Sequence, residues 1–369
     1  MTDIARKRVT YLFGAGASHA AVKAVGSAYG ILMNDLTSEL AEVVRNSVYR
    51  EPFAASQSLK HLANHVIDDR SDVEHIITFL DQSPSGLHRK FAEELRKSFE
   101  TVLRKRLEAV YEEVGEKQCD LYAALLDMYD VPGFSETLNG FLTLNYDSLL
   151  ESAVKRFSNR HVEYGIAIAE PSAGTRATPV IKLHGSFDWE QVWPIRQLTA
   201  GTSLCWIPPG IQKAKESYPF NLLWGRAREL LACDVLRIVG CSLGPNDWDL
   251  VSLLFGTRHV VETGEPYEIH VIDSPARAKE LKQQFPYLDI RSILEVEPVG
   301  SQLVAEFGGG EPRRFDTLDS EEQDKLVHAA TGKNWLLVWV SLMAETTYRD
   351  LGSVATPLGA LQHILDAYA

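Results

Sequence analysis

Small and polar residues follow several apolar segments of the chain, and their types are those that bind or cleave a nucleotide. The first place is "GAGAS", residues 14 to 18, directly after "RVTYLF". Glycines there let the backbone approach a phosphate, and the start of a helix offers free N–H groups and the positive end of its dipole. A tight turn without a ligand explains them equally well, because His19 stands where the third glycine of G-x-G-x-x-G would be.

Two further places carry side chains that can take part in catalysis. In "TLNYD", Asn145 can hold a water or a sugar hydroxyl through its amide, while Asp147 can either cap the helix that follows or contact a ligand. In "KLHGS", His184 follows an apolar run and is a candidate general base, because histidine titrates near neutral pH. A lone histidine is more often structural, and the chain has 11.

The last two places can hold a ribose or a phosphate. "IVGCSLG" presents Gly240 and Ser242, and "HVIDS" ends on Asp273, at a position where dinucleotide-binding folds often carry an acid for the ribose hydroxyls. Each of the five places follows a strand-like segment. We therefore expect them to meet at one edge of a sheet and to define a single site.

The elements that must position this site alternate between strands and helices. Short buried strands are predicted for "RVTYLFG", "GFLTLNYD", "PVIKLHGS", "CDVLRIVGCSL" and "YEIHVIDS". Helical patterns follow several of them, in "DSLLESAVKRF", "PNDWDLVSLLF" and "PARAKELKQQF". This alternation predicts an α/β fold with a Rossmann-like, doubly wound parallel sheet.

A helical insertion is expected between the first two strands, over residues 35–130. It contains the amphipathic run "LHRKFAEELRKSFETVLRKRLEAVYEEV", and Ser71 with Glu74 forms a predicted capping box before "HIITFLDQ". Residues 157–179 and 187–225 are expected to be loops or a small second lobe. We expect a catalytic domain over 1–300 and, after the linker-like "GGGEP", a C-terminal extension over 301–369 with short helices that contacts an edge or another subunit.

Composition excludes several classes of protein. The net charge is −13 and no basic run is present, so direct nucleic-acid binding is not expected. The four cysteines, at 119, 205, 233 and 241, have no C-x-x-C spacing, so neither a zinc ribbon nor another metal site is expected. "MTDIARKRVT" lacks the apolar block of a secretory signal and "NWLLVWVSLMA" is too short to span a bilayer, which predicts a cytoplasmic protein without a membrane contact.

Five segments resemble the motifs of the sirtuin family in their order along the chain, from about residue 10 to residue 285. They are "GAGAS", "TLNYD", "LHGS", "VGCSL" and "VID". The resemblance implies an NAD-binding sheet and cleavage of the bond between nicotinamide and ribose. It implies that Asn145 positions the ribose or a water and that His184 is the general base. The residues expected to bind the nucleotide are Gly14, Ala15, Gly16, Ala17, Ser18, Asn34, Tyr146, Asp147, Gly240, Ser242 and Asp273.

Two departures from the deacylating sirtuins change the expected substrate. Their two C-x-x-C pairs are missing, and a long helical block precedes "TLNYD". The chain is more similar to the prokaryotic sirtuin-like proteins of anti-phage defence, which hydrolyse NAD, and among them to the subunit that works with a separate HerA-type ATPase. We therefore expect an NAD hydrolase that yields nicotinamide and ADP-ribose, acts in abortive infection and forms a homo-oligomer.

Alternatives remain open from the sequence. One alternative hypothesis is an NAD-dependent protein deacylase. The other is a non-catalytic sensor of NAD or ADP-ribose that regulates a partner. A nuclease has less support, because the acidic residues form no clear metal-ligand motif.

Overall fold

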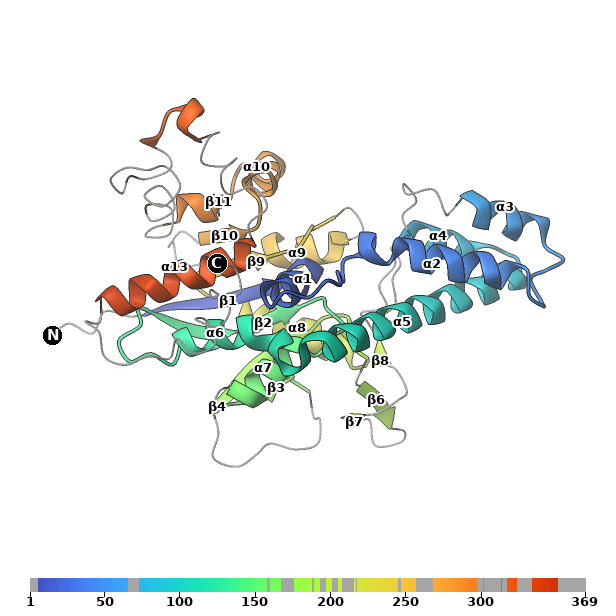
Figure 1. Ribbon diagram of the computed structural model, residues 1–369, viewed down its shortest axis with the longest axis horizontal. Coiled ribbons are helices and arrows are strands. Elements are labelled where there is room, and N and C mark those ends of the chain that lie inside the picture. Colours follow the sequence, from blue (N-terminus) through green and yellow to red (C-terminus); the bar gives the residue numbers. More distant parts are fainter. Residues whose placement is uncertain are drawn as a thin grey trace.

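The computed structural model is built around a seven-stranded sheet in the order β11-β10-β9-β1-β2-β4-β3 (Figure 1). All of its strand pairs are parallel. The strands are β1 (Lys7–Phe13), β2 (Glu136–Thr143), β3 (Arg160–Glu163), β4 (Arg176–Lys182), β9 (Val235–Val239), β10 (Glu268–Ile272) and β11 (Asp289–Ser292). The expected α/β class with a doubly wound parallel sheet is confirmed.

The structure describes most of the chain. The described residues are 6–65, 73–157, 160–166, 176–187, 189–192, 197–200, 205–207, 216, 218–244, 247–256, 268–296, 301, 313, 317–323 and 334–350. Ser71 of the predicted capping box, the linker-like segment 308–312 and the tail helix expected near the C-terminus lie outside these residues, as does the side chain of Glu74. No helix among the described residues is long and apolar enough to cross a membrane.

Strand β1 lies in the middle of the sheet and is buried on both faces. Leu12 pairs with Leu142 of β2 on one side and with Ile238 of β9 on the other. Tyr11 and Phe13 pack on one face of the sheet, while Leu12 packs on the other. This explains why the segment reads as a continuous apolar run, since parallel strands are covered on both sides.

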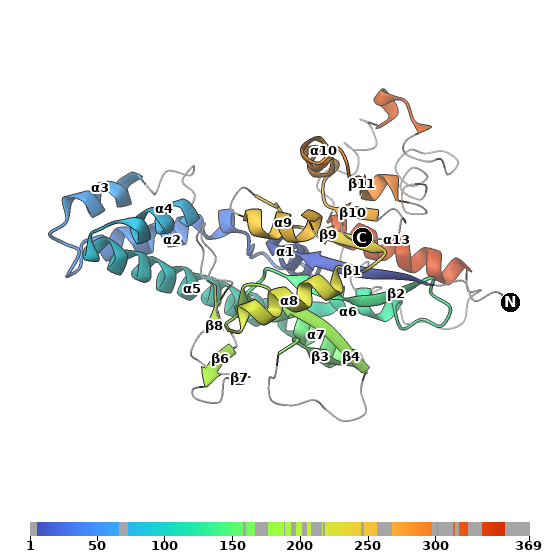
Figure 2. The same ribbon diagram turned by 180° about the vertical axis from the view of Figure 1, so that it is seen from behind.

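Helices cover both faces of the sheet, each with its own hydrophobic core. One face carries α1 (Ala15–Ala24), α6 (Asp120–Met128), α7 (Leu149–Phe157) and α13 (Trp335–Asp350). The opposite face carries α8 (Phe220–Leu230), α9 (Trp248–Gly256) and α10 (Pro275–Gln284), of which α8 and α9 lie in front in the reverse view (Figure 2).

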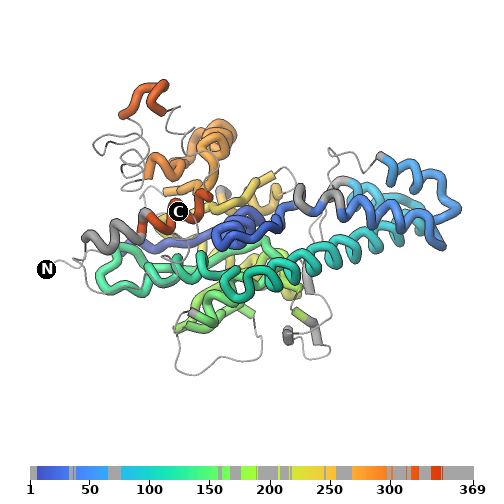
Figure 3. The backbone as a smooth tube through the Cα atoms, viewed as in Figure 1, coloured from blue at the N-terminus to red at the C-terminus, as the bar shows by residue number. Residues whose placement is uncertain are grey.

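A helical lobe extends from one end of the sheet body (Figure 3). It consists of α2 (Met33–Val48), α3 (Gln57–His65), α4 (Val73–Gln82) and α5 (Gly86–Val114), which share a separate core. The 29 residues of α5 bury a stripe that includes Phe91, Leu95 and Phe99, so the long amphipathic helix predicted from the sequence is confirmed. After the short 3-10 helix Gly115–Cys119, α6 returns to the core of the sheet body.

The segments expected to be loops or a second lobe are more ordered than the sequence indicates. They contain β3, the first residues of β4 and most of α8, and these belong to the main α/β body. The second segment also contains the antiparallel pair of β6 (Trp189–Val192) and β7 (Gln197–Ala200), and its strand β8 (Cys205–Trp206) pairs with β5 (Gly185–Ser186), which precedes the segment. The prediction missed β3 because an edge strand of sequence RHVE has no apolar pattern to reveal it.

Candidate functional site

The candidate site lies at the carboxyl edge of four adjacent strands, in the order β9-β1-β2-β4. Gly14 and Gly240 come one residue after the ends of β1 and β9, and Asn145 and His184 come two residues after the ends of β2 and β4. Because these strands are parallel neighbours, their ends lie side by side. Open α/β sheets bind ligands at this edge.

The glycines of the first loop contact the loop after β9. The N–H groups of Gly14 and Gly16 donate to the carbonyls of Val239 and Gly240 at 3.0 and 2.9 Å. A Cβ atom at Gly14 or Gly16 would come within 2.5 or 2.7 Å of Gly240 backbone atoms, and one at Gly240 would lie 2.4 Å from the nitrogen of Ala17. Gly240 also has φ +53. This contact by itself requires glycine at all three positions, with or without a nucleotide.

Asn145 is held by α1 and the turn before it. Its Nδ2 donates to the carbonyl oxygen of Gly14 and to the Oγ of Ser18, both at 2.9 Å. A carbonyl oxygen only accepts hydrogen bonds, so the amide nitrogen must face Gly14 and the orientation of the carboxamide is determined. Both N–H donors of the amide are thus engaged. Among the described contacts, its oxygen Oδ1 has no hydrogen-bond partner, so it is the acceptor that Asn145 offers to a ligand.

Behind Asn145, two more residues fix this geometry. The Oγ of Ser18 lies 3.1 Å from the hydroxyl of Tyr122 on α6. Burial raises the pKa of Tyr122 well above its usual value, so this phenol stays protonated and can donate to Ser18. The backbone N–H of Asn145 donates to the Oγ1 of Thr143 at 3.0 Å. The side chain and the backbone of Asn145 are therefore both anchored.

His184 is connected with Tyr146, the residue after Asn145, by a ring contact and by hydrogen bonds through Ile207. Its carbonyl accepts the N–H of Ile207 at 2.8 Å, while the carbonyl of Ile207 accepts the hydroxyl of Tyr146 at 2.8 Å. The ring of Tyr146 is 6.3 Å from that of His184 and stacks on Phe187 at 5.2 Å. His184 and Asn145 are only 6% and 9% exposed. His184 thus lies next to Tyr146, the residue that follows Asn145, and both candidate catalytic residues are largely buried.

The structure gives Asp147 a capping role. Its Oδ1 accepts the N–H of Leu149, the first residue of α7, at 3.1 Å. This is the capping alternative expected from the sequence. Asp147 also borders a cavity of about 350 Å³, so its side chain is within reach of a ligand there as well.

The remaining predicted nucleotide-binding residues lie around the same edge. Ala15, in the first turn of α1, and Ser242, in the loop after β9, are exposed. Asp273 follows β10, its Oδ1 accepts the N–H of Ser274 at 2.6 Å, and burial raises its pKa. No described contact connects Ser242 or Asp273 with Asn145 or His184. Asn34 lies in the first turn of α2, and its side chain is outside the described part of the chain.

A cavity adjoins the loop after β2, where the helical lobe meets the sheet body. Three carboxylates and three aromatic rings contribute to its wall, and the guanidinium of Arg104 is already bound to Glu100 at 2.8 Å and to the Phe187 carbonyl at 2.7 Å. This lining favours a planar cationic or neutral group over a phosphate. The lining residues are Arg104, Leu107, Glu108, Tyr111, Glu112, Tyr146, Asp147, Ser148 and Phe187.

Sequence reasoning missed Lys182 and its partner Glu151. Both side chains are buried, and the Nζ of Lys182 donates to the Oε1 of Glu151 at 2.7 Å. A lysine inside the otherwise apolar run "PVIKLHGS" was the available signal, because such a charge is stable in a core only when it is paired. Among the described residues, no three histidine, cysteine or acidic side chains are grouped so that they could hold a metal ion.

Fold and site together define an α/β protein of the doubly wound class with a polar site at the carboxyl edge of its sheet. Residues 139–285 match the family model described as "SIR2-like domain". The matched segment runs from within β2 to the residue after α10, so it includes Asn145, His184, Gly240 and Asp273. No curated protein matches the chain.

Several solved structures of Sir2 homologues are similar to the chain. A mutant in complex with 2′-O-acetyl ADP-ribose has 15% identity and a TM-score of 0.36, covering 93% of this chain and 94% of the other. A homologue in complex with NAD has 16% identity and a TM-score of 0.33, with coverages of 93% and 91%. A mutant in complex with ADP-ribose has 17% identity and a TM-score of 0.32, with coverages of 88% and 92%.

Proposed function

We propose that the protein is an NAD⁺ nucleosidase, which cleaves the bond between nicotinamide and ribose to give nicotinamide and ADP-ribose. The observation that carries this proposal is the orientation of Asn145. Its amide nitrogen is bound to Gly14 and Ser18, so its oxygen is the acceptor left for a substrate hydroxyl or a water at the edge where His184 lies. The SIR2-like match supports NAD as the substrate, because it covers both residues.

The reaction uses the two residues as follows. The C1′–N bond breaks, its electron pair goes to the pyridinium nitrogen, and nicotinamide leaves as a neutral molecule while positive charge develops on the ribose. Asn145 orients the attacking water or a ribose hydroxyl through Oδ1, and His184 accepts the proton that the water loses on attack. The burial of both residues limits bulk water and strengthens their interactions with the charged ribose.

The placement of the substrate follows from the charges along the edge. The acidic and aromatic cavity beside Tyr146 suits the pyridinium end of NAD, which is planar and cationic. The pyrophosphate and the adenosine ribose are assigned to the loops after β1, β9 and β10. In this proposal the contacting residues are Gly14, Ala15, Gly16, Ala17, Ser18, Asn34, Tyr146, Asp147, Gly240, Ser242 and Asp273.

The test is product analysis after the purified protein is incubated with NAD. Asn145→Ala and His184→Ala should each reduce NAD consumption at least about 100-fold, the loss typical of a positioned catalytic group. Asn139→Ala and His88→Ala are matched controls, because Asn139 bonds Thr10 and Leu230 and His88 bonds serines of the helical lobe. Folded Asn145 and His184 variants with near-normal turnover would contradict the proposal.

Two other results of the same experiment would assign a different function. Nicotinamide release that requires an acylated peptide would identify a deacylase. Tight NAD binding without any product, also in the presence of a partner, would identify a sensor.

We further propose that NAD depletion by this protein serves anti-phage defence in the cytoplasm. In this proposal the protein is a homo-oligomer and its partner is a HerA-type ATPase. The support is the likeness of "GAGASHA", "LTLNYDSLLE" and "KLHGSFDW" to sirtuin-like defence proteins. Cells that express the wild type with a HerA-type ATPase should lose NAD and resist phage, whereas cells with His184→Ala should do neither. Equal phage resistance in both strains would contradict the proposal.

A further inference from the structure

The buried ion pair of Lys182 and Glu151 links the strand that precedes His184 to the helix that follows the loop of Asn145. Lys182 is the last residue of β4, two positions before His184, and Glu151 lies in the first turn of α7. Their side chains are 0% and 4% exposed and are joined at 2.7 Å. The proposed cleavage of NAD gives neither residue a chemical task.

Lys182 has a second acceptor, which belongs to the loop of Asn145. Its Nζ donates to the backbone carbonyl oxygen of Asp147, two residues after Asn145. Sheet pairing brings the two strands to this point, because Thr143 is in register with Lys182 and its carbonyl accepts the N–H of Leu183 at 2.9 Å. The ammonium group therefore continues the connection between the two strands beyond the end of the sheet.

The segment around His184 also holds the preceding carbonyl of the same loop. Ser186 donates through its Oγ and Phe187 through its backbone N–H to the carbonyl oxygen of Tyr146, at 3.2 and 3.3 Å. Two successive carbonyls after Asn145 are thus fixed by residues on either side of His184. The loop carrying Asn145 takes its position from the strand that carries the candidate base.

Stability alone does not explain a buried lysine here. Replacing a buried ion pair by apolar residues of similar volume is often neutral or stabilising, whereas removing one partner is strongly destabilising. The ammonium group of Lys182 donates a hydrogen bond to the backbone carbonyl of Asp147 and so sets the position of that carbonyl. An apolar side chain cannot make this hydrogen bond. Burial raises the pKa of Glu151 and Lys182 opposes this rise, so the pair is electrostatically coupled.

We infer that Lys182 is a positioning residue of the site: bound to Glu151, its ammonium group fixes the Asp147 carbonyl and thereby the placement of Asn145 relative to His184. The inference rests on the proposed function for its kinetic consequence. Its structural consequence, a change in the surroundings of the His184 ring when Lys182 is removed, is independent of the proposed function.

The test compares two double variants. Lys182→Met with Glu151→Leu removes the pair without leaving a buried charge, so the protein should stay folded. Lys7→Met with Glu268→Leu is the control for loss of an ion pair elsewhere, because that pair is also joined at 2.7 Å but is partly exposed and lies at the start of β1 and β10, at the opposite end of the sheet. Thermal unfolding is used to check that both double variants are folded.

Two readouts are taken on each variant. In the NAD assay, loss of the Lys182 pair should lower kcat about 10-fold or more, the effect of misplacing a catalytic group, with KM changed less than about threefold. In ¹H–¹⁵N spectra of the imidazoles, the His184 signals, assigned with His184→Ala, should shift. The control pair should leave kcat, KM and these signals unchanged.

The readouts separate the two proposals. If the wild type does not consume NAD but the His184 signals move on loss of the Lys182 pair, the proposed function is wrong and the positioning role holds. If the wild type consumes NAD and the folded Lys182 double variant has a normal kcat and unmoved His184 signals, the positioning role is wrong and the proposed function holds.

Discussion

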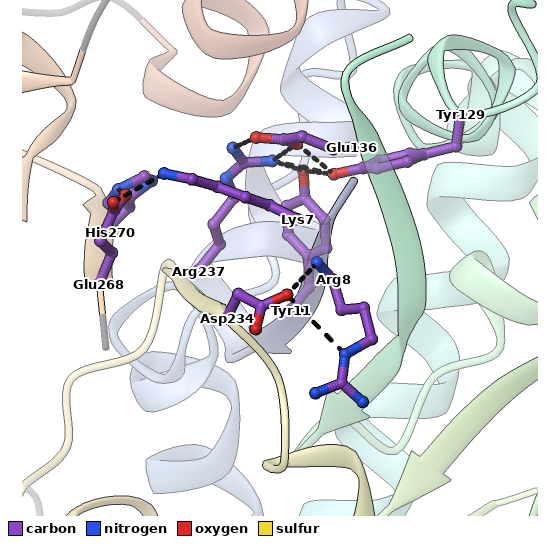
Figure 4. Close-up of polar contacts among 9 residues, drawn as sticks. All are labelled: Lys7, Arg8, Tyr11, Tyr129, Glu136, Asp234, Arg237, Glu268 and His270. Carbon is purple, nitrogen blue, oxygen red and sulfur yellow. Dashed lines mark hydrogen bonds and ion pairs between the residues drawn. The ribbon is translucent and has the colours of Figure 1, made fainter. Parts of the chain in front are cut away.

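Arg237 of β9 and Glu136 of β2 form a two-point ion pair inside the sheet body, with hydrogen bonds of 2.6 and 2.7 Å (Figure 4). The side chain of Arg237 is 2% exposed and that of Glu136 is 12% exposed. The Nη1 of Arg237 also donates to the hydroxyls of Tyr11 and Tyr129, both at 2.9 Å. On its other side the guanidinium lies 4.4 Å from the centroid of the Trp339 ring, so the same group connects three strands, the residue after α6, and α13.

This arrangement predicts that Arg237→Met strongly destabilises the fold. The substitution would leave Glu136 charged and nearly buried, a situation that lowers the free energy of unfolding by about 3–5 kcal/mol. Urea unfolding measures the change. The exposed pair of Arg291 and Asp289 provides the control, because Arg291→Met should change stability by less than about 1 kcal/mol. A fully stable Arg237→Met protein would show that the pair is not needed to hold these elements.

The contact between the two glycine loops predicts opposite effects of alanine at two glycines. Gly240→Ala places a Cβ atom 2.4 Å from backbone atoms of α1 in a left-handed conformation, so the backbone must shift and the protein should lose more than about 2 kcal/mol of stability. Gly225, inside α8, has open space around it. Gly225→Ala should therefore stabilise by about 0.5–1 kcal/mol. Melting temperatures that move in the same direction for both variants would contradict this explanation.

Strands, helices and the residues that follow them could be predicted wherever the pattern of apolar residues within one segment is sufficient to identify the element. The apolar run before Gly14 reveals β1, and the three- and four-residue spacing in α5 reveals a helix from sequence alone. Asn145 and His184 could be assigned to the carboxyl edge of the sheet because each follows such a strand. These signals are local, since side-chain periodicity depends only on the element itself.

Relationships between distant segments could not be predicted in this way. Gly14 and Gly240 look like parts of separate phosphate loops, and only the placement of β9 beside β1 shows that they pack on each other. The partner of Lys182 was hidden for the same reason, because Glu151 lies on a helix that reaches β4 only in the folded chain. Strand alternation predicts the fold class but does not determine strand order.

The anchoring of Asn145 predicts a kinetic role for Ser18. Ser18→Ala removes one of the two acceptors of the Asn145 amide, so the side chain should be held less well and kcat for NAD cleavage should fall about 10-fold, equivalent to roughly 1.4 kcal/mol. Ser98→Ala is the matched control, because Ser98 is a buried helical serine that donates to its own helix, at the carbonyl of Glu94. Equal kcat values for the two variants would show that Ser18 does not orient Asn145.

Asp127 of α6 predicts a pH-dependent stability with a definite sign. Burial, reinforced by Asp130 and opposed by Arg160, raises the pKa of Asp127 from 3.8 to about 6. Between these values the folded state binds more protons than the unfolded state, so this residue makes the protein less stable as the pH rises towards 6. Asp127→Asn should therefore stabilise the fold at pH 7 by about 1 kcal/mol, after allowance for partial solvent exposure. Below pH 4 the difference from the wild type should disappear.

Glu113 supplies the control of opposite sign for this pH dependence. Its carboxylate accepts hydrogen bonds from the Ser27 hydroxyl and the Ala28 N–H, which lower its pKa below the usual 4.5. The stabilisation from Glu113 is thus present above pH 4.5 and is lost as the pH falls through the lowered value. Glu113→Gln should be less stable than the wild type at pH 7 and approach it in acid. Urea unfolding of both variants between pH 3 and 7 covers both titration ranges and gives the two slopes, and slopes of the same sign would contradict the assigned causes.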